Sequence, residues 1–225
     1  ESFVKQIGSI VFWKSFLYTF LRVIISFCIS LVIGFLFGFL CATNSFFHDF
    51  FKIPLSVLRS TPVISIILIA LFWFNSSTVP IFVGILMTLP IVTTSVEKGL
   101  VTSNQELIQM SKIYKFTKKQ TFIYIKLHYS IPYIATGALS SFGLSWKVIA
   151  AGEVLSLPRY GIGSILQKNQ VHLESANIIS TTIILVTVSF ILERILNKIE
   201  VSTNYKKMGT IESGGYIWHT TGSGK

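Results

Sequence analysis

Four long stretches without a charged residue constrain this chain more than any other feature. They cover residues 23–42, 60–96, 129–146 and 175–192. A helix needs about 20 apolar residues to cross the hydrocarbon core of a bilayer. The 60–96 stretch is too long for one crossing, and its middle, FNSSTVP at 74–80, is typical of a turn. The sequence therefore predicts an all-α membrane protein with five spans, at about residues 17–42, 61–75, 79–98, 130–153 and 175–194.

Composition agrees with a membrane chain, and the lysines set its orientation. Only 12% of the residues are charged and the mean hydropathy is +0.67, whereas about a quarter of the residues of a soluble domain are charged. Lysines gather in the loop at 103–128 and after the last span. Positively charged loops stay in the cytoplasm, so we expect Lys52 and Arg59 to be cytoplasmic too, with segment 1–15 outside. The net charge of +10 then reflects topology and anionic lipid headgroups, and gives no case for nucleic acid.

The two ends of the chain give further expectations. The chain begins at Glu1 rather than Met, and we expect a fragment in which one further span ahead of Glu1 would make six helices. Residues 201–225 become polar and rich in Gly, Ser and Thr. Their last letters, TTGSGK, match part of a phosphate-binding loop but lack its flanking strand and helix and the Ser or Thr that follows the Lys. We expect a disordered tail there, without a nucleotide site.

Small residues form regular stripes in two of the spans. Every fourth position of the first span is small: Ser26, Ser30, Gly34, Gly38 and Ala42. The span after the basic loop repeats the pattern with Gly137, Ser141 and Ser145. Such stripes let helix backbones approach closely in lipid, so we expect helix packing there. Cys28 and Cys41 serve as small apolar residues of the first span, and no disulfide or metal site is indicated.

Pro90 lies inside the third predicted span. A proline there removes one backbone hydrogen bond and bends or breaks the helix, unless neighbouring groups satisfy the freed carbonyl. Thr88, Thr93 and Thr94 lie close enough in sequence to do so. Two readings remain open: a structural kink, or a bent helix in which Pro90 and Thr94 form part of a translocation pathway.

Ionisable residues near the bilayer core are costly, and they usually face the bundle interior or water. Glu153, flanked by Ala150, Ala151 and Gly152, is therefore a candidate gate or pathway residue. Lys147 either reaches the membrane interface with its long side chain or pairs with Glu153. Arg22, at the outer end of its span, is expected to be an interfacial anchor.

The basic loop at 103–128 predicts two short helices. Ser103 with Glu106 and Thr117 with Gln120 both fit the capping box, so we expect helices to start at Asn104 and just after Thr117. The first must then end near Lys115 or Phe116. The apolar faces of these helices fit either an amphipathic hairpin lying on lipid headgroups or a docking surface for a partner.

The same loop resembles a known signature. Residues 109–128 are similar to the cytoplasmic EAA-x3-G-x9-I-x-L-P signature of binding-protein-dependent ABC importer permeases. The spacing agrees, and Ile125 and Leu127 match the signature, whereas Gln109, Met110, Ser111, Lys115 and His128 replace its Glu, two Ala, Gly and Pro. The resemblance to the family extends over about residues 15–200, through Arg22-Val23 and Arg59 to Pro62. Trp146-Lys147 with Glu153, and Arg159 to Gly163, resemble features of its nitrate, sulfonate and taurine branch.

This resemblance implies a type I importer permease with cytoplasmic coupling helices, over residues 16–200. It implies a homodimer with two cytoplasmic ABC ATPases and an extracytoplasmic solute-binding protein, in a bacterial inner membrane. The ATPase-coupling residues would be Gln109, Met110, Ser111, Lys115, Ile125 and Leu127; the pathway or gate residues would be Pro90, Thr94, Trp146, Lys147 and Glu153.

Catalysis and substrate follow from the same resemblance. ATP and Mg²⁺ would bind the partner ATPase, and this chain would hold no cofactor and no catalytic residue. The solute would be small and anionic, of the sulfonate, nitrate, taurine or vitamin-precursor class. An ion-coupled secondary transporter subunit stays as the alternative, although only one broken helix and no internal repeat are visible.

Overall fold

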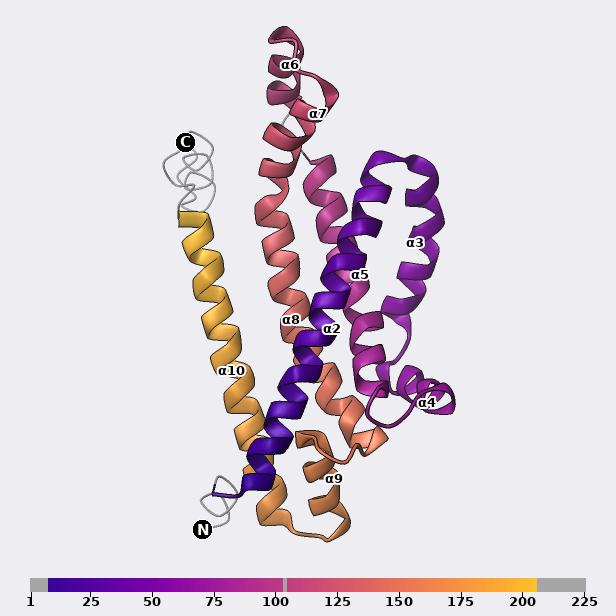
Figure 1. Cartoon of the computed structure of the whole chain (residues 1–225), viewed down its shortest axis with the longest axis vertical. Coiled ribbons are helices and arrows are strands. Elements are labelled where there is room, and N and C mark those ends of the chain that lie inside the picture. Colours follow the sequence, from indigo (N-terminus) through magenta and orange to yellow (C-terminus); the bar gives the residue numbers. More distant parts are fainter. Residues whose placement is uncertain (1–7, 103–104, 206–225) are drawn as a thin grey trace, which may run out of the picture.

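A computed structural model describes residues 8–102 and 105–205, and this part of the chain is helical throughout, without strands (Figure 1). Three helices are long and apolar enough to cross a membrane as single elements: α2 (Ile10–Thr43), α5 (Val79–Val101) and the first 18 residues of α10 (Ser175–Tyr205). A fourth crossing is the continuous stretch Lys118–Ser156. The predicted all-α membrane fold is therefore confirmed.

The helices run between two ends of an elongated bundle (Figure 1). α2 runs from one end to the other, and α3 (Ser45–Ser60) turns back beside it. α5 and α10 run in the same sense as α2, and α8 (His128–Ser156) runs against them. α6 (Gln105–Ile113) and α7 (Lys118–Gln120) form one extreme of the molecule, called the lysine-rich end below. α9 (Ile162–Val171) lies at the opposite end.

The second crossing differs from the predicted single helix at 61–75. α4 (Val63–Trp73) has 11 residues, about 17 Å at 1.5 Å per residue, which is too short to cross a bilayer. Only together with α3 is it long and apolar enough for a crossing, and the two helices meet at a bend of 102°. The bend follows from Pro62, because a residue before proline is driven out of the helical region, and Thr61 is extended at φ −78° and ψ 130°.

The predicted packing of the small-residue stripes is confirmed. Ser26, Ser30, Gly34 and Gly38 are all buried in α2. A Cβ at Gly34 would lie 2.7 Å from Val92 Cβ, and one at Gly38 would lie 2.6 Å from the Thr93 carbonyl oxygen, so these glycines allow α2 to lie directly on α5. The second stripe, Gly137, Ser141 and Ser145, is likewise buried in α8. These contacts make α2, α5 and α8 the packed centre of the bundle.

The second helix of the basic loop is not a separate element. From Lys118 the chain continues through α7, a π-helical segment η1 (Thr121–Leu127) and α8 as one stretch that ends at Ser156. The helix that contains the span expected from residue 130 therefore begins 12 residues earlier, inside the loop, and its 39 residues are more than one crossing needs. Phe122 anchors the π segment by packing edge-on against Phe39 of α2, with ring centroids 5.4 Å apart. The predicted capping box at Ser103 and the tail at 206–225 lie outside the described residues.

Candidate coupling and translocation sites

The turn after α6 is closed by a Schellman motif. The amide of Phe116 donates to the carbonyl of Ser111 at 2.9 Å, and the amide of Lys115 donates to the carbonyl of Lys112 at 3.1 Å. Lys115 takes the left-handed conformation, with φ 54°. A glycine would adopt it freely, whereas a side chain there costs about 1–2 kcal/mol. Lys115 adopts this strained conformation, and the first helix of the loop ends close to Lys115, as expected.

The next helix starts with the predicted capping box, which is confirmed. The hydroxyl oxygen of Thr117 accepts from the amide of Gln120 at 3.3 Å, and the side-chain oxygen of Gln120 accepts from the amide of Thr117 at 2.9 Å. Two capping motifs therefore fix both sides of the turn. The backbone between α6 and α7 has little freedom to change direction.

The six predicted coupling residues differ in how far they are exposed. Gln109, Met110 and Lys115 are exposed, Ser111 and Ile125 are buried, and Leu127 is half-buried. The hydroxyl of Ser111 donates to the carbonyl of Ile108 at 2.7 Å, so it supports the turn from inside. Large apolar side chains are also exposed there, notably Ile113 at 78% and Tyr114 at 69%. Ile113 was not predicted as a site residue, although its place in the last turn of a short helix is a signal for it.

Arg59 lies at the end of α3 and reaches the middle of α5. Its Nη2 donates to the carbonyl oxygen of Pro90 at 2.9 Å and to Oγ1 of Thr94 at 2.8 Å. Thr94 Oγ1 also donates to the Pro90 carbonyl at 2.9 Å. The structure thus brings the two predicted pathway residues of α5 together with Arg59, which was expected on the cytoplasmic side. The structure differs from that expectation, because α3 carries Arg59 away from the lysine-rich end, to the middle of α5.

The threonines around Pro90 do not act as expected. A proline at this position frees the carbonyl of Leu86. Thr88 Oγ1 donates instead to the carbonyls of Gly84 and Ile85, at 2.8 and 3.4 Å. Helix α5 nevertheless continues from Val79 to Val101 without a break.

A buried ion pair joins α2 to α8 near the end opposite the lysine-rich end. Nη1 of Arg22 lies 2.6 Å from Oε1 of Glu153, with side-chain exposures of 7% and 0%. Thr19 Oγ1 lies 2.9 Å from both carboxylate oxygens, and the amide of Gly163 donates to Oε2 at 3.1 Å. Arg22 Nη1 also donates to the carbonyl of Tyr160 at 2.7 Å. We refer to these residues, Thr19, Arg22, Glu153, Tyr160 and Gly163, as the carboxylate clamp.

The carboxylate clamp corrects two expectations. Arg22 is a buried partner of Glu153 and not an interfacial anchor, and Glu153 pairs with Arg22 and not with Lys147. Lys147 is exposed. The sequence did contain a signal for the burial of Arg22. Arg22 and Thr19 lie four and seven positions before Ser26, so they share the face of α2 that holds Ser26 and Ser30.

Glycines allow the clamp to close. A Cβ at Gly161 would lie 2.7 Å from Cδ of Glu153, and one at Gly163 would lie 2.7 Å from Cβ of Glu153. Neither distance is compatible with a side chain. The two glycines bring the start of α9 directly onto the carboxylate, so the clamp holds α2, α8 and α9 together.

Trp146 lies in the packed interior. It is 2% exposed and its ring centroid is 6.1 Å from that of Phe16.

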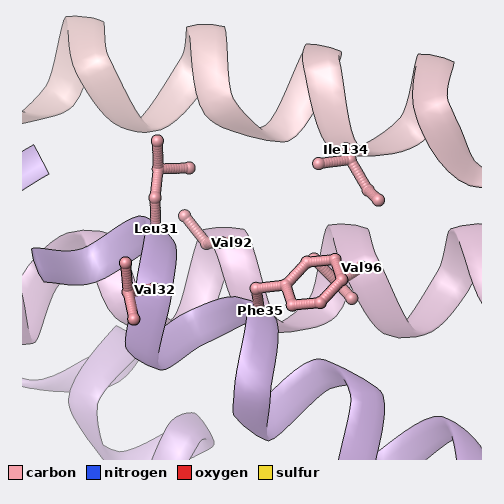
Figure 2. A pocket seen from close by; sticks show the side chains of 6 residues that line it. All are labelled: Leu31, Val32, Phe35, Val92, Val96 and Ile134. Atoms are coloured by element: carbon pink, nitrogen blue, oxygen red, sulfur yellow. The ribbon is translucent and has the colours of Figure 1, made fainter. Parts of the chain in front are cut away.

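A pocket of about 350 Å³ lies further along the bundle, lined by Leu31, Val32 and Phe35 of α2, Val92 and Val96 of α5, and Ile134 of α8 (Figure 2). Its lining side chains are all apolar, so it offers no hydrogen bond to compensate an ion for lost water.

Solved structures of known transporters share this architecture. A structure of the MetNI methionine ABC transporter in an inward-facing conformation matches 84% of this chain and 93% of its own, with a TM-score of 0.67 and 17% identity. An amino acid ABC transporter solved with histidines matches 83% of this chain and 91% of its own, with a TM-score of 0.63 and 14% identity. At such identities the likeness shows the fold, which is that of type I ABC importer permeases.

Sequence relatives are more specific. The Nitrate import permease protein NrtB of Synechocystis sp. is 31% identical over 128 residues, which cover 55% of this chain and 45% of that protein. The protein of the same name from Leptolyngbya laminosa is 29% identical over 101 residues, covering 44% of this chain and 36% of its own length. The matched part thus spans less than half of these relatives. The family model described as binding-protein-dependent transport system inner membrane component matches residues 34–202, and this chain belongs to that family of ABC importer permeases.

Proposed function

We propose that this chain is the membrane permease subunit of an ATP-driven importer of a small anionic solute. It works as a homodimer with two ABC ATPases and an extracytoplasmic solute-binding protein, in a bacterial inner membrane. ATP and Mg²⁺ are bound and hydrolysed by the ATPase, and this chain supplies the pathway. The nitrate permeases among its relatives support the anionic class.

The observation that carries the coupling role is the shape of the loop between α5 and α8. α6 and α7 extend beyond the ends of α2, α3 and α5 (Figure 1), and their tip exposes Met110, Ile113 and Tyr114 at 45%, 78% and 69%. A rigid turn with exposed apolar side chains fits a helix-in-groove contact with a protein partner. Lysines around the tip, among them Lys112, add positive charge, which suits an acidic partner and anionic headgroups alike. The projection of the tip beyond the ends of α2, α3 and α5 favours a docking surface over a hairpin lying on lipid.

The experiment is co-purification of the ATPase with tip variants. Ile113→Asp and Tyr114→Asp each place a charge at the proposed contact, and both residues are exposed. A change at Ile125 would disturb buried contacts, because Ile125 is only 9% exposed. Leu173→Asp is the matched control, since Leu173 is 85% exposed and follows α9 at the opposite end. We expect the tip variants to lose the ATPase and nitrate uptake, and the control to retain the ATPase. Equal recovery of the ATPase with all three variants would refute docking through this turn.

The rival function is an ion-coupled secondary transporter. It requires uptake that continues without any ATPase. Nitrate uptake by vesicles that contain this chain alone would support the rival, and uptake that depends on the ATPase and ATP would exclude it.

A further inference from the structure

Helix α3 has a polar side that is exposed. Asp49, Lys52, Ser56 and Arg59 follow one another at intervals of three or four residues, so they lie along one face of the helix, and all four are exposed. We call this face the polar stripe. A separate exposed face of α3 carries Phe46, Phe50, Ile53 and Val57, which are 55–70% exposed. The helix therefore separates a surface suited to water from one suited to lipid or protein.

The polar stripe runs from the lysine-rich end to the middle of the bundle. His48 pairs with Glu97 of α5, and Arg59 contacts Pro90 and Thr94 of the same helix. Glu97 and Pro90 are seven positions apart, about 10 Å at 1.5 Å per residue. Helix α5 has no charged residue between Val79 and Val96. The guanidinium of Arg59 thus lies at the depth of the hydrocarbon core, where a charged group must face water or protein.

Arg59 carries a charge that no carboxylate neutralises. Among the side chains that the structure describes, the ion pairs join Arg22 to Glu153 and His48 to Glu97. The two hydrogen bonds of Arg59 go to a carbonyl and a hydroxyl oxygen, both from Nη2. A guanidinium has five N–H donors in a planar fork that matches two oxygens of an oxyanion. Arg59 therefore keeps both its charge and part of its donor set for a ligand.

We propose that Arg59 coordinates the oxyanion of the solute during transport, at the break between α3 and α4, and that the polar stripe lines the water-filled path from there to the lysine-rich end. This inference deepens the proposed anion importer and rests on it. Arg59 sets the charge selectivity of the pathway, and its bonds to Pro90 and Thr94 hold the guanidinium at the wall of α5. The apolar pocket of Figure 2 has no part in this path.

The first test is water access, measured by thiol labelling of the assembled transporter. In a chain with Cys28→Ala and Cys41→Ala, Ser56→Cys tests the polar stripe and Val57→Cys is its matched control on the apolar face. The probes are two small water-soluble thiosulfonates, one anionic and one cationic. We expect both to label Ser56→Cys and to leave Val57→Cys largely unlabelled. Equal labelling of the two positions, or none at Ser56→Cys, would overturn the path along the stripe.

The second test is charge selectivity, measured on the same Ser56→Cys background. Arg59→Gln removes the charge, and we expect the ratio of anionic to cationic labelling rates to fall by about tenfold. Arg59→Lys keeps the charge and should keep most of the ratio. Lys168→Gln removes an exposed charge from α9 at the opposite end and should leave the ratio near that of the unchanged chain. An unchanged ratio in Arg59→Gln would overturn the role of Arg59.

Nitrate uptake completes the test and separates this inference from the proposed function. We expect Arg59→Gln to lose at least about tenfold in nitrate uptake while the ATPase still co-purifies, with partial recovery in Arg59→Lys. Normal uptake by Arg59→Gln would refute coordination by Arg59 while leaving the permease assignment intact. Loss of the ATPase from the unchanged chain would refute the proposed function, and the labelling ratios would still decide whether Arg59 controls anion access.

Discussion

Removing the carboxylate of Glu153 is expected to destabilise the bundle strongly. The side chain is fully buried, pairs with Arg22 at 2.6 Å and accepts bonds from Thr19 and the Gly163 amide. Glu153→Gln keeps the shape but leaves the charge of Arg22 buried without a counter-charge. Breaking one side of a buried pair typically costs about 3–5 kcal/mol. We therefore expect a loss of that size in the free energy of unfolding, measured by denaturant titration of the purified chain in mixed detergent micelles.

A double-mutant cycle tests the origin of that loss. Arg22→Met should cost a similar amount, because it leaves the carboxylate buried and unpaired. The double variant Arg22→Met with Glu153→Gln removes both charges, and it should cost at least about 2 kcal/mol less than the sum of the two single changes. Lys147→Met is the control, since Lys147 lies on the same helix but is exposed, and it should change stability by less than about 0.5 kcal/mol. Additive single changes, or a Glu153→Gln loss as small as that of Lys147→Met, would refute the buried pair as the main contact.

Three further variants test the turn and the close helix contacts. Lys115→Gly relieves the left-handed strain and should raise the amide-exchange protection of the α6 turn by about 1 kcal/mol, and unchanged exchange would contradict the strain. Thr117→Ala removes the capping box and should lower that protection by about 1 kcal/mol, and unchanged protection would refute a stabilising role for the cap. Gly163→Ala should lower the midpoint of thermal unfolding by the equivalent of about 1–3 kcal/mol, because its Cβ would lie 2.7 Å from Cβ of Glu153, whereas Gly143→Ala, with no atom within 4 Å, should not destabilise.

Local chemistry predicted several parts of this fold correctly from the sequence. The four-residue spacing of Ser26, Ser30, Gly34 and Gly38 identified the face of α2 that packs on α5. The Thr117 capping box formed as predicted, since both of its hydrogen bonds join residues three apart. Such features depend on spacing within one helix or turn, and the tertiary structure does not change that spacing.

Contacts between distant residues were not predictable in the same way. Arg22 and Glu153 lie 131 residues apart. From its position at the end of an apolar stretch alone, Arg22 was expected to be an interfacial anchor. Placing Arg22 on the buried face of α2 was within reach of the sequence. Choosing Glu153 over Lys147 as partner required the position of α8 relative to α2 and the close approach of α9, and the sequence contains neither.

The failure at α3 has a physical reason that also points to the pathway. A search for apolar stretches finds helices surrounded by lipid or by other apolar helices, but a helix beside a water-filled path must carry a polar face, which lowers its mean hydropathy. Residues 45–60 were therefore assigned to a cytoplasmic connection, although their polar residues recur with helical spacing and Thr61-Pro62 marks the end of a helix. In a permease, a span that a search for apolar stretches misses is therefore the first place to look for contacts with the solute. Here that span holds Arg59, which lies against Pro90 and Thr94 in the middle of the bundle.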